Sequence, residues 1–155
     1  WAAAREAAKA QEKDISFRVV GSDIDPKSLK QARINAEKAG VTDLVAFQRI
    51  PLADIRSKKR YGVIITNPPY GERLGDVKKL RPLYEEMGRV FRALPDWSYF
   101  IITAYPDFQQ VFGEKATKNR KLYNSTIQTY FYEYFGPLPP KKRAGRPESE
   151  TTTDE

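Results

Sequence analysis

The sequence predicts an α/β protein with a mostly parallel, doubly wound sheet, and three observations support this fold class. Short apolar segments typical of strands alternate with segments whose apolar residues recur at helical spacing. Capping residues bound the helical segments, as Asp25-Pro26 and Gly40 do for one of them. Near residue 120 the alternation stops, and two successive strand-like segments predict a terminal antiparallel hairpin.

The first fifty residues predict a helix, a strand, a helix and a strand in that order. Residues 1–13 are rich in Ala and have the composition of a helix. Residues 17–23 form a short apolar segment that ends on an acid, which indicates a buried strand. Residues 26–39 place Leu and Ala along one helical face, and residues 44–50 return to a strand pattern.

The middle of the chain continues the alternation. Residues 61–66 are apolar enough to predict a third strand that is covered on both faces. Residues 80–94 carry a helical stripe of Leu, Tyr, Met and Phe. A fourth strand is expected at residues 97–104, followed by a short helix at residues 106–112.

The terminal hairpin is predicted from residues 121–123 and 126–135, joined by a tight turn at Asn124-Ser125. Basic and aromatic residues are interleaved around it, and they are Lys115, Lys118, Arg120, Lys121, Tyr123, Tyr130, Phe131, Tyr132, Tyr134 and Phe135. Such a mixture is found in RNA-binding surfaces and also in packed strands. The length of the aromatic strand favours packing in the core.

Charge and composition divide the chain into a folded part, residues 1–135, and a tail, residues 136–155. The tail is rich in Pro, then in Ser, Thr and Glu, without hydrophobic periodicity, and is expected to be disordered. It holds four basic and four acidic residues, so the whole formal charge of +7 belongs to the folded part. That surplus suits a polyanionic partner, although moderate basicity is common in soluble proteins.

The absence of Cys and His excludes many kinds of chemistry. Cysteine nucleophiles, histidine general bases, Ser-His-Asp triads, Cys/His zinc sites, haem and iron–sulfur ligation all need residues that this chain lacks. No apolar run is long enough to span a membrane. Catalysis would therefore depend on carboxylates, amides, backbone groups or a bound cofactor.

The motif Asn67-Pro68-Pro69-Tyr70-Gly71 directly follows the predicted strand 61–66. Ligands of open α/β sheets bind beyond the carboxyl ends of the strands, where this motif falls. Two prolines stiffen the loop, so the Asn67 amide and the Pro68 carbonyl can act as two aimed acceptors beside the Tyr70 ring. An exocyclic amine of a nucleobase, with two N–H donors and a flat π-system, fits that arrangement. The alternative is a simple turn after a strand.

Asn-Pro-Pro-Tyr in this position resembles the catalytic motif of class I S-adenosylmethionine-dependent amino-methyltransferases. The longer string from Asn67 to Gly75, together with residues 21–26 and 120–124, resembles bacterial THUMP-domain-type methyltransferases of guanine N2 in 23S ribosomal RNA. Members of that family are often labelled as adenine-specific DNA methylases. The resemblance covers roughly residues 15–135.

The resemblance implies a partial methyltransferase domain with a Rossmann-like class I sheet and the following site residues. Asn67, Pro68, Pro69 and Tyr70 would be catalytic, and Asn67 would also face the cofactor, S-adenosylmethionine. Asp23 would accept hydrogen bonds from the cofactor ribose, and Ile24 would lie beneath its adenine. Asp54 would meet the adenine amine. Alternatively, Asp23 only helps to begin the next helix, and Asp54 caps a surface turn.

Glu72 and Arg73 follow the motif and would contact substrate, because a guanidinium can bind phosphate or a base edge. An ion pair between these neighbours is the alternative. The resemblance further implies a cytoplasmic enzyme that acts on 23S ribosomal RNA without a metal and carries an upstream RNA-binding domain.

Two features of the family are missing from this sequence, namely the first, central strand and the Gly-rich turn after it. We therefore expect a fragment that binds the cofactor weakly and is inactive alone. Two other functions stay open: N6-adenine methylation of DNA, and noncatalytic RNA binding by a retained fold.

Overall fold

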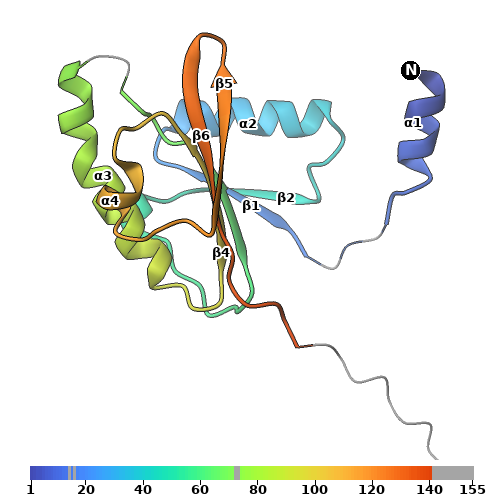
Figure 1. Cartoon of the computed structure of the whole chain (residues 1–155). Coiled ribbons are helices and arrows are strands. Elements are labelled where there is room, and N and C mark those ends of the chain that lie inside the picture. The colour runs from blue at the N-terminus through green and yellow to red at the C-terminus, as the bar shows by residue number, and fades with distance from the viewer. Residues whose placement is uncertain (14, 16, 72–73, 141–155) are drawn as a thin grey trace, which may run out of the picture. The chain divides into compact units, whose positions relative to one another are not determined.

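The structure is a computed structural model that describes residues 1–13, 15, 17–71 and 74–140. The chain forms two compact units, Trp1–Ile55 and Arg56–Glu155, each with its own strands and helices (Figure 1). Residues 136–140 of the predicted tail contain no helix or strand, and the rest of that tail lies outside the described residues.

The first unit contains a parallel βαβ arrangement. Its elements are α1 (Ala2–Lys9), β1 (Val19–Asp23), α2 (Pro26–Lys38), β2 (Val45–Arg49) and a short 3-10 helix (Leu52–Asp54). β1 and β2 pair in parallel, with Asp23 opposite Arg49. The prediction that the first of these strands is buried is wrong, because Val19 and Val20 are 53% and 57% exposed. α2 contacts both strands and buries Leu29 and Ala36. Among the described residues before β1, the one regular element is the helix α1.

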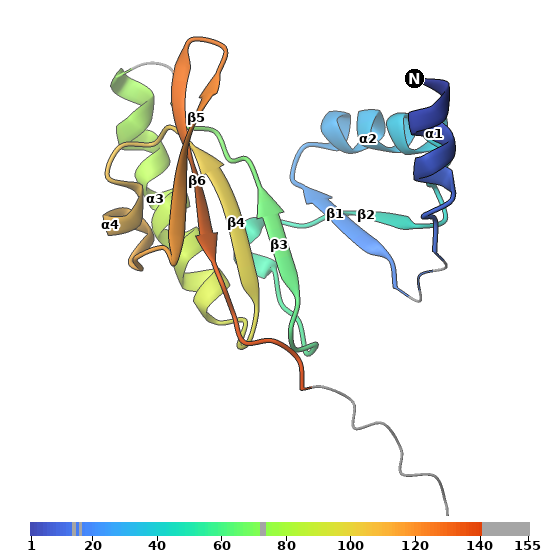
Figure 2. The ribbon, with the colours of Figure 1, turned by 45° about the vertical axis from the view of Figure 1, so that its right-hand side comes forward.

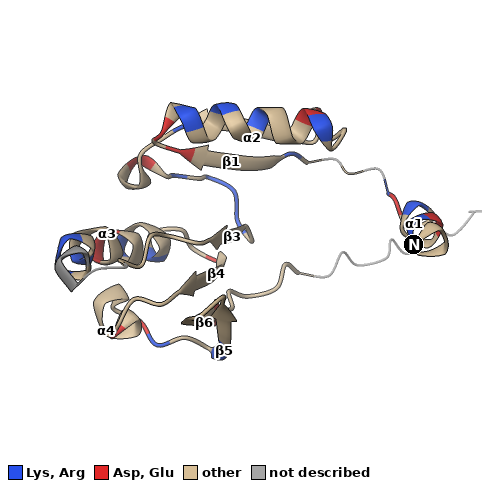
Figure 3. Ribbon diagram, turned by 90° about the horizontal axis from the view of Figure 1, so that it is seen from above, with Lys and Arg blue, Asp and Glu red and all other residues tan. Residues whose placement is uncertain are grey.

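The ends of α2 confirm the capping prediction. The Asp25 carboxylate accepts hydrogen bonds from the backbone N–H groups of Lys27 and Ser28, at 3.0 and 3.2 Å. At the other end Gly40 adopts a φ of +69°, which a residue with a side chain rarely tolerates. Lys and Arg residues are spread along the exposed side of α2 and on the segment that leads into β3 (Figure 3).

The second unit contains a four-stranded mixed sheet. Its elements are β3 (Val63–Thr66), α3 (Leu74–Arg92), β4 (Ser98–Thr103), α4 (Phe108–Phe112), β5 (Lys118–Asn124) and β6 (Ile127–Tyr134). The strand order is β3-β4-β6-β5 (Figure 2). β3 and β4 are parallel, whereas β6 is antiparallel to both of its neighbours. The α/β class, the parallel pairs and the terminal hairpin are therefore as predicted, with the strands divided between two sheets.

The core of the second unit is mostly aromatic. Tyr84 and Phe91 of α3 and Phe108 and Phe112 of α4 are at most 2% exposed. Their rings meet each other and those of β4 and β6; for example, Phe108 lies 4.5 Å from Tyr132 between ring centroids. The prediction that the aromatic residues of the last strand belong to the core is confirmed for Tyr132 and Tyr134, which are buried. It is wrong for Phe135, which is 49% exposed, and Tyr130 and Phe131 are half-buried.

Three expectations for this unit are corrected by the structure. α3 begins at Leu74 and not near residue 80; Leu74 and Val77 already stand at helical spacing before Leu80, and the predicted stripe left them out. The hairpin turn comprises Ser125 and Thr126, since Asn124 still pairs with Ile127 in the strand register. Tyr123 is 65% exposed on the edge strand β5, so it does not join the aromatic core.

The prediction that β3 is covered on both faces is also wrong for the described residues. Val63 and Ile65 are 58% and 78% exposed, whereas the intervening Ile64 is half-buried. Because side chains alternate along a strand, Val63 and Ile65 share one face. α3 and α4 pack against the side chains of the opposite face, so β3 keeps one apolar face uncovered.

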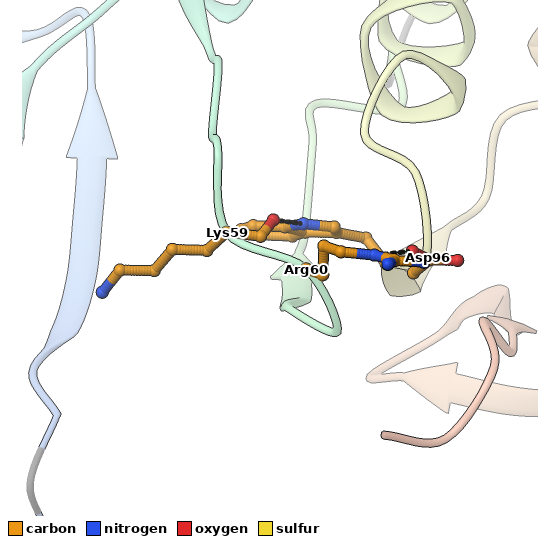
Figure 4. Close-up of polar contacts among 4 residues, drawn as sticks. Lys59, Arg60 and Asp96 are labelled. Atoms are coloured by element: carbon orange, nitrogen blue, oxygen red, sulfur yellow. Dashed lines mark hydrogen bonds and ion pairs between the residues drawn. The ribbon is translucent and has the colours of Figure 1, made fainter. Parts of the chain in front are cut away.

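The residues that precede β3 contact the residues that precede β4 (Figure 4). Arg60 and Asp96 form an ion pair with an Nε to Oδ2 distance of 2.6 Å. The Trp97 indole N–H donates to the Lys59 carbonyl at 2.8 Å. A side chain at Gly62 would place its Cβ 2.4 Å from the Trp97 ring, so only glycine permits this close stacking. These contacts set the start of the parallel pair whose opposite ends carry the candidate site.

Candidate active site

The 67–71 loop, residues Asn67 to Gly71, leaves the carboxyl end of β3. β4 runs parallel to β3 and ends at Thr103, so the two strand ends lie at the same edge of the sheet. Pro68 is buried, whereas the Asn67 side chain is exposed. Gly71 has a φ of +75°, which turns the chain away towards α3. In this loop the buried Pro68 anchors the chain directly next to Asn67, which is exposed to solvent.

Two hydrogen bonds hold the 67–71 loop from different elements. The Tyr84 hydroxyl of α3 donates to the Pro69 carbonyl at 3.0 Å. The Asn124 side chain, at the end of β5, donates through Nδ2 to the Tyr70 hydroxyl at 3.1 Å. No hydrogen bond between described residues uses the Asn67 side chain, which leaves its carbonyl oxygen available as an acceptor.

Neither contact to the loop follows from sequence reasoning. Tyr84 is predicted only as part of a helical stripe, and Asn124 only as part of a turn. The signal for Asn124 is its place within residues 120–124, one of the strings on which the family resemblance depends. For Tyr84 the signal is weaker: a phenol on the buried face of a helix needs a polar partner.

A cleft of about 450 Å³ lies beside the 67–71 loop. It is lined by Tyr70, Gly71, Ala104, Ile127 and Gln128, so the loop, the end of β4 and the start of β6 all contribute. Tyr70 supplies a ring and Gln128 an amide, the combination that can stack against a flat base and bond to its edge. A larger hollow along α1 is bounded by residues of that single helix and has no opposing wall.

The predicted cofactor residues lie in the first unit, after its strands. Asp23 ends β1, and its Oδ1 accepts from the backbone N–H of Asp25 at 2.8 Å. The carboxylate therefore does help to shape the turn into α2, as the alternative interpretation requires. Ile24 is 62% exposed, and its carbonyl accepts from the Arg49 guanidinium at 2.9 Å. Asp54 is exposed at the end of the 3-10 helix after β2.

These two groups of residues belong to different units, Asp23, Ile24 and Asp54 to Trp1–Ile55 and the 67–71 loop to Arg56–Glu155. In the first unit Asp23 and Ile24 stand at the carboxyl end of β1, and Asp54 follows the end of the parallel strand β2 by five residues. In the second unit the 67–71 loop directly follows β3, which is parallel to β4. Glu72 and Arg73 lie outside the described residues. The side chains that the structure describes contain no group of three or more Asp or Glu residues suited to holding a metal ion.

The basic residues of the hairpin are exposed, because β5 is the edge strand of its sheet. Lys121 places its Nζ 5.6 Å from the centroid of the Tyr123 ring. Arg120 is paired with Glu133 at 3.5 Å. Over the described parts of the chain, none of the helices combines the length and apolarity needed to cross a bilayer.

The parallel strand pairs, their helices and the 67–71 loop match the fold of solved α/β methyltransferases. Residues 1–133 match the family model of the RMKL-like methyltransferase domain, and the chain belongs to that family. This confirms the family resemblance and the fold class predicted from the sequence.

Known proteins that are similar in sequence or structure support the assignment to this methyltransferase family. The ribosomal RNA large subunit methyltransferase K/L of Legionella pneumophila (strain Corby) is 38% identical over 133 residues, which are 85% of this chain and 19% of that protein. Among solved structures, "SMU.472, a putative methyltransferase complexed with SAH" is 42% identical with a TM-score of 0.80, over 88% of this chain and 36% of that one.

A further solved structure, described as a predicted N6-adenine-specific DNA methylase from Listeria monocytogenes, is 43% identical with a TM-score of 0.72. The alignment covers 88% of this chain and 35% of that structure. The chain thus spans less than two fifths of the length of each of these three relatives.

Proposed function

We propose that this chain contributes to an enzyme that methylates an exocyclic amine of a nucleobase with S-adenosylmethionine, and that the target is guanine N2 in 23S ribosomal RNA. The observation that carries the proposal is the 67–71 loop, in which an exposed Asn67 amide follows a parallel strand directly. The RNA assignment is supported by the similarity to the ribosomal RNA large subunit methyltransferase K/L of Legionella pneumophila. The choice of guanine N2 is supported only by the family resemblance.

The residues of the first unit fit the proposed cofactor chemically. The Asp23 carboxylate uses Oδ1 for the turn, and Oδ2 has the chemistry to accept from ribose hydroxyls. Ile24 offers an exposed apolar side chain of the kind that adenine covers. Asp54 is assigned to the adenine amine, which needs an acceptor. The relative solved with S-adenosylhomocysteine supports this choice of cofactor.

The chain's own groups then act on the target amine. When bound, S-adenosylmethionine supplies an electrophilic methyl group. The Asn67 Oδ1 and the Pro68 carbonyl accept the two N–H hydrogens of the amine, which draws its nitrogen towards tetrahedral geometry and directs the lone pair at the methyl carbon. As the nitrogen–methyl bond forms, the methyl–sulfur bond would break and S-adenosylhomocysteine would leave. Positive charge would develop on the nitrogen, so both acceptors would bind the transition state more strongly than the ground state, and the surplus proton would then pass to solvent. Tyr70 positions the base through its ring.

Substrate binding extends beyond these four residues in the proposal. Glu72 and Arg73 would contact the RNA at the mouth of the 67–71 loop. The upstream RNA-binding domain expected from the resemblance would supply most of the affinity. An enzyme of this kind would work in the cytoplasm, where ribosomal RNA is modified.

The test is methyl transfer by the complete natural protein that contains this chain, with transcribed 23S ribosomal RNA as substrate. Nucleosides from the product are separated by mass spectrometry, so that N2-methylguanosine and N6-methyladenosine are distinguished. Asn67→Ala should lower the transfer rate by about 100-fold or more, the loss typical for one preorganised polar group, and leave RNA affinity within about twofold. Asn35→Ala, which removes an exposed amide on α2, is the matched control.

Three other results would contradict all or part of this proposal. N6-methyladenosine in DNA or RNA would replace guanine N2 by the adenine alternative. Undiminished transfer by the Asn67→Ala variant would remove the 67–71 loop from the catalytic centre. RNA binding without transfer or S-adenosylhomocysteine affinity, in every variant, would show a noncatalytic RNA-binding protein.

A further inference from the structure

Tyr84 connects three elements beneath the 67–71 loop. The residue lies on α3 and is completely buried. Its hydroxyl is 3.0 Å from the Pro69 carbonyl and 2.7 Å from Oγ1 of Thr103, the last residue of β4. Thr103 is also completely buried. The loop, the helix and the neighbouring strand are therefore joined at a single phenol oxygen.

The direction of every proton in this network can be deduced. A carbonyl can only accept, so the Tyr84 hydroxyl donates its one hydrogen to Pro69. Tyr84 must then accept from Thr103, whose single hydrogen is thereby used. The backbone N–H of Tyr105 donates to the same Thr103 oxygen at 3.0 Å. The relay runs from Tyr105 N–H through Thr103 and Tyr84 to the Pro69 carbonyl, and each hydroxyl donates once and accepts once.

The surroundings hold the phenol in this orientation. The Tyr84 ring stacks on the Tyr105 ring with centroids 4.2 Å apart, and Phe108 meets it edge-on at 5.6 Å. Burial raises the pKa of Tyr84 to about 12, so the hydroxyl keeps its proton at physiological pH. Removing either hydroxyl would leave the other, buried hydroxyl without its hydrogen-bond partner. The two hydroxyls therefore depend on each other.

We infer that Tyr84, supported by Thr103, is a positioning residue for methyl transfer: it fixes the Pro69 peptide and thereby the directions of the Pro68 carbonyl and the Tyr70 ring. This inference rests on the proposed function for its kinetic consequence. Tyr84 does not touch the substrate. A carbonyl next to a fixed peptide has little freedom to swing, and small displacements of a reacting group are costly in rate.

The experiment compares two buried phenols in the complete natural protein. Tyr84→Phe removes the hydroxyl that holds the loop, and Tyr105→Phe removes one that donates instead to the Val77 carbonyl of α3 at 3.2 Å. Both changes keep the stacked rings. We expect Tyr84→Phe to lower kcat by about 10- to 100-fold with KM for RNA and Kd for S-adenosylhomocysteine within about twofold, since misplacement acts on the chemical step. Tyr105→Phe should leave kcat within about twofold of the wild type.

Variants of Thr103 provide the rescue. Thr103→Ser keeps the hydroxyl and should retain most of kcat, whereas Thr103→Val keeps the volume and should approach the Tyr84→Phe value. Melting temperatures are measured for all four variants. A kcat loss that simply follows the loss of melting temperature across the set would overturn the inference, because a merely structural role predicts that pattern.

A second readout does not depend on activity. Amide hydrogen exchange of the peptide that contains Asn67, Tyr70 and Gly71 should accelerate in Tyr84→Phe and not in Tyr105→Phe. Faster exchange in a protein that transfers no methyl group would keep Tyr84 as the residue that holds the loop and reject the proposed function. Unchanged exchange together with unchanged kcat would reject the role of Tyr84 while the proposed function stands.

Discussion

The two units of this chain bury very different amounts of apolar surface. Of the fifteen apolar residues that are buried in the described parts of the chain, Leu29 and Ala36 belong to the first unit and thirteen belong to the second. Several apolar residues of the first unit are instead exposed, including Val19, Val20 and Ile24. The candidate catalytic loop therefore stands on a core of its own, whereas the predicted cofactor residues follow strands that have almost none.

The difference shows which candidate site residues are held firmly in position and which are not. The 67–71 loop is held by buried side chains from a helix and a strand, and that support persists as long as the aromatic core is intact. Asp23 and Ile24 are held mainly by backbone contacts and by Arg49, all of them exposed to solvent. We expect the first unit to loosen at lower denaturant concentration than the second.

The largest effect is expected in the second unit from Phe112→Ala. Phe112 is completely buried, and its ring contacts Phe91, Tyr99, Phe108 and Tyr134. Loss of that ring should cost about 3–5 kcal/mol of unfolding free energy, measured by denaturant titration. Hydrogen exchange in β4 and β6 should accelerate. A cost below about 1 kcal/mol would mean that the aromatic cluster does not stabilise this unit.

A smaller effect is expected in the first unit from Leu29→Ala. Leu29 is 4% exposed, yet it packs within a two-stranded unit that can relax around the change. The cost should be near 2 kcal/mol, the low end for such a truncation. Exchange should accelerate in α2 and β1 and stay unchanged in β4 and β6. If hydrogen exchange accelerated equally in β4 and β6, the two units would unfold together. That result would contradict the expected difference in their stability.

The smallest effect concerns acid and Asp25. Hydrogen bonds from the Lys27 backbone and the Ser28 side chain lower the pKa of Asp25 below its usual 3.8. The unfolded chain then binds the proton more readily, so this stabilisation is present above about pH 4 and is lost as the pH falls through the folded pKa. Asp25→Asn keeps the cap and removes the titration. Its stability should therefore fall less steeply below pH 4 than that of the wild type, as followed by circular dichroism.

Local chemistry accounts for most of what the sequence predicted correctly. Asp25 and Gly40 mark the ends of α2 because capping depends on one or two residues. Met87 and Phe91 are buried as their helical spacing predicts. The 67–71 loop lies after a parallel strand because strand and motif are adjacent in the chain.

What the sequence did not predict depends on distant partners. Asn124 meets Tyr70 across 54 residues, and Tyr84 meets Pro69 through a hydroxyl that helical periodicity treats as apolar. The exposed Val63 and Ile65 were misjudged for a similar reason, because composition shows that a strand is apolar and not which of its faces is covered. The roles of Asp23, Ile24, Asp54 and Asn67 stay predictions until they are measured.

The stacking of Trp97 on Gly62 has an optical consequence. The chain has two tryptophans: Trp1 is fully exposed, whereas Trp97 is half-buried with its indole N–H bonded to the Lys59 carbonyl. In a Trp1→Phe background the tryptophan fluorescence would come from one indole, just before the start of β4. Its emission maximum would shift to the red when the second unit unfolds. Trp97 is therefore an intrinsic fluorescent probe of the unit that supports the 67–71 loop.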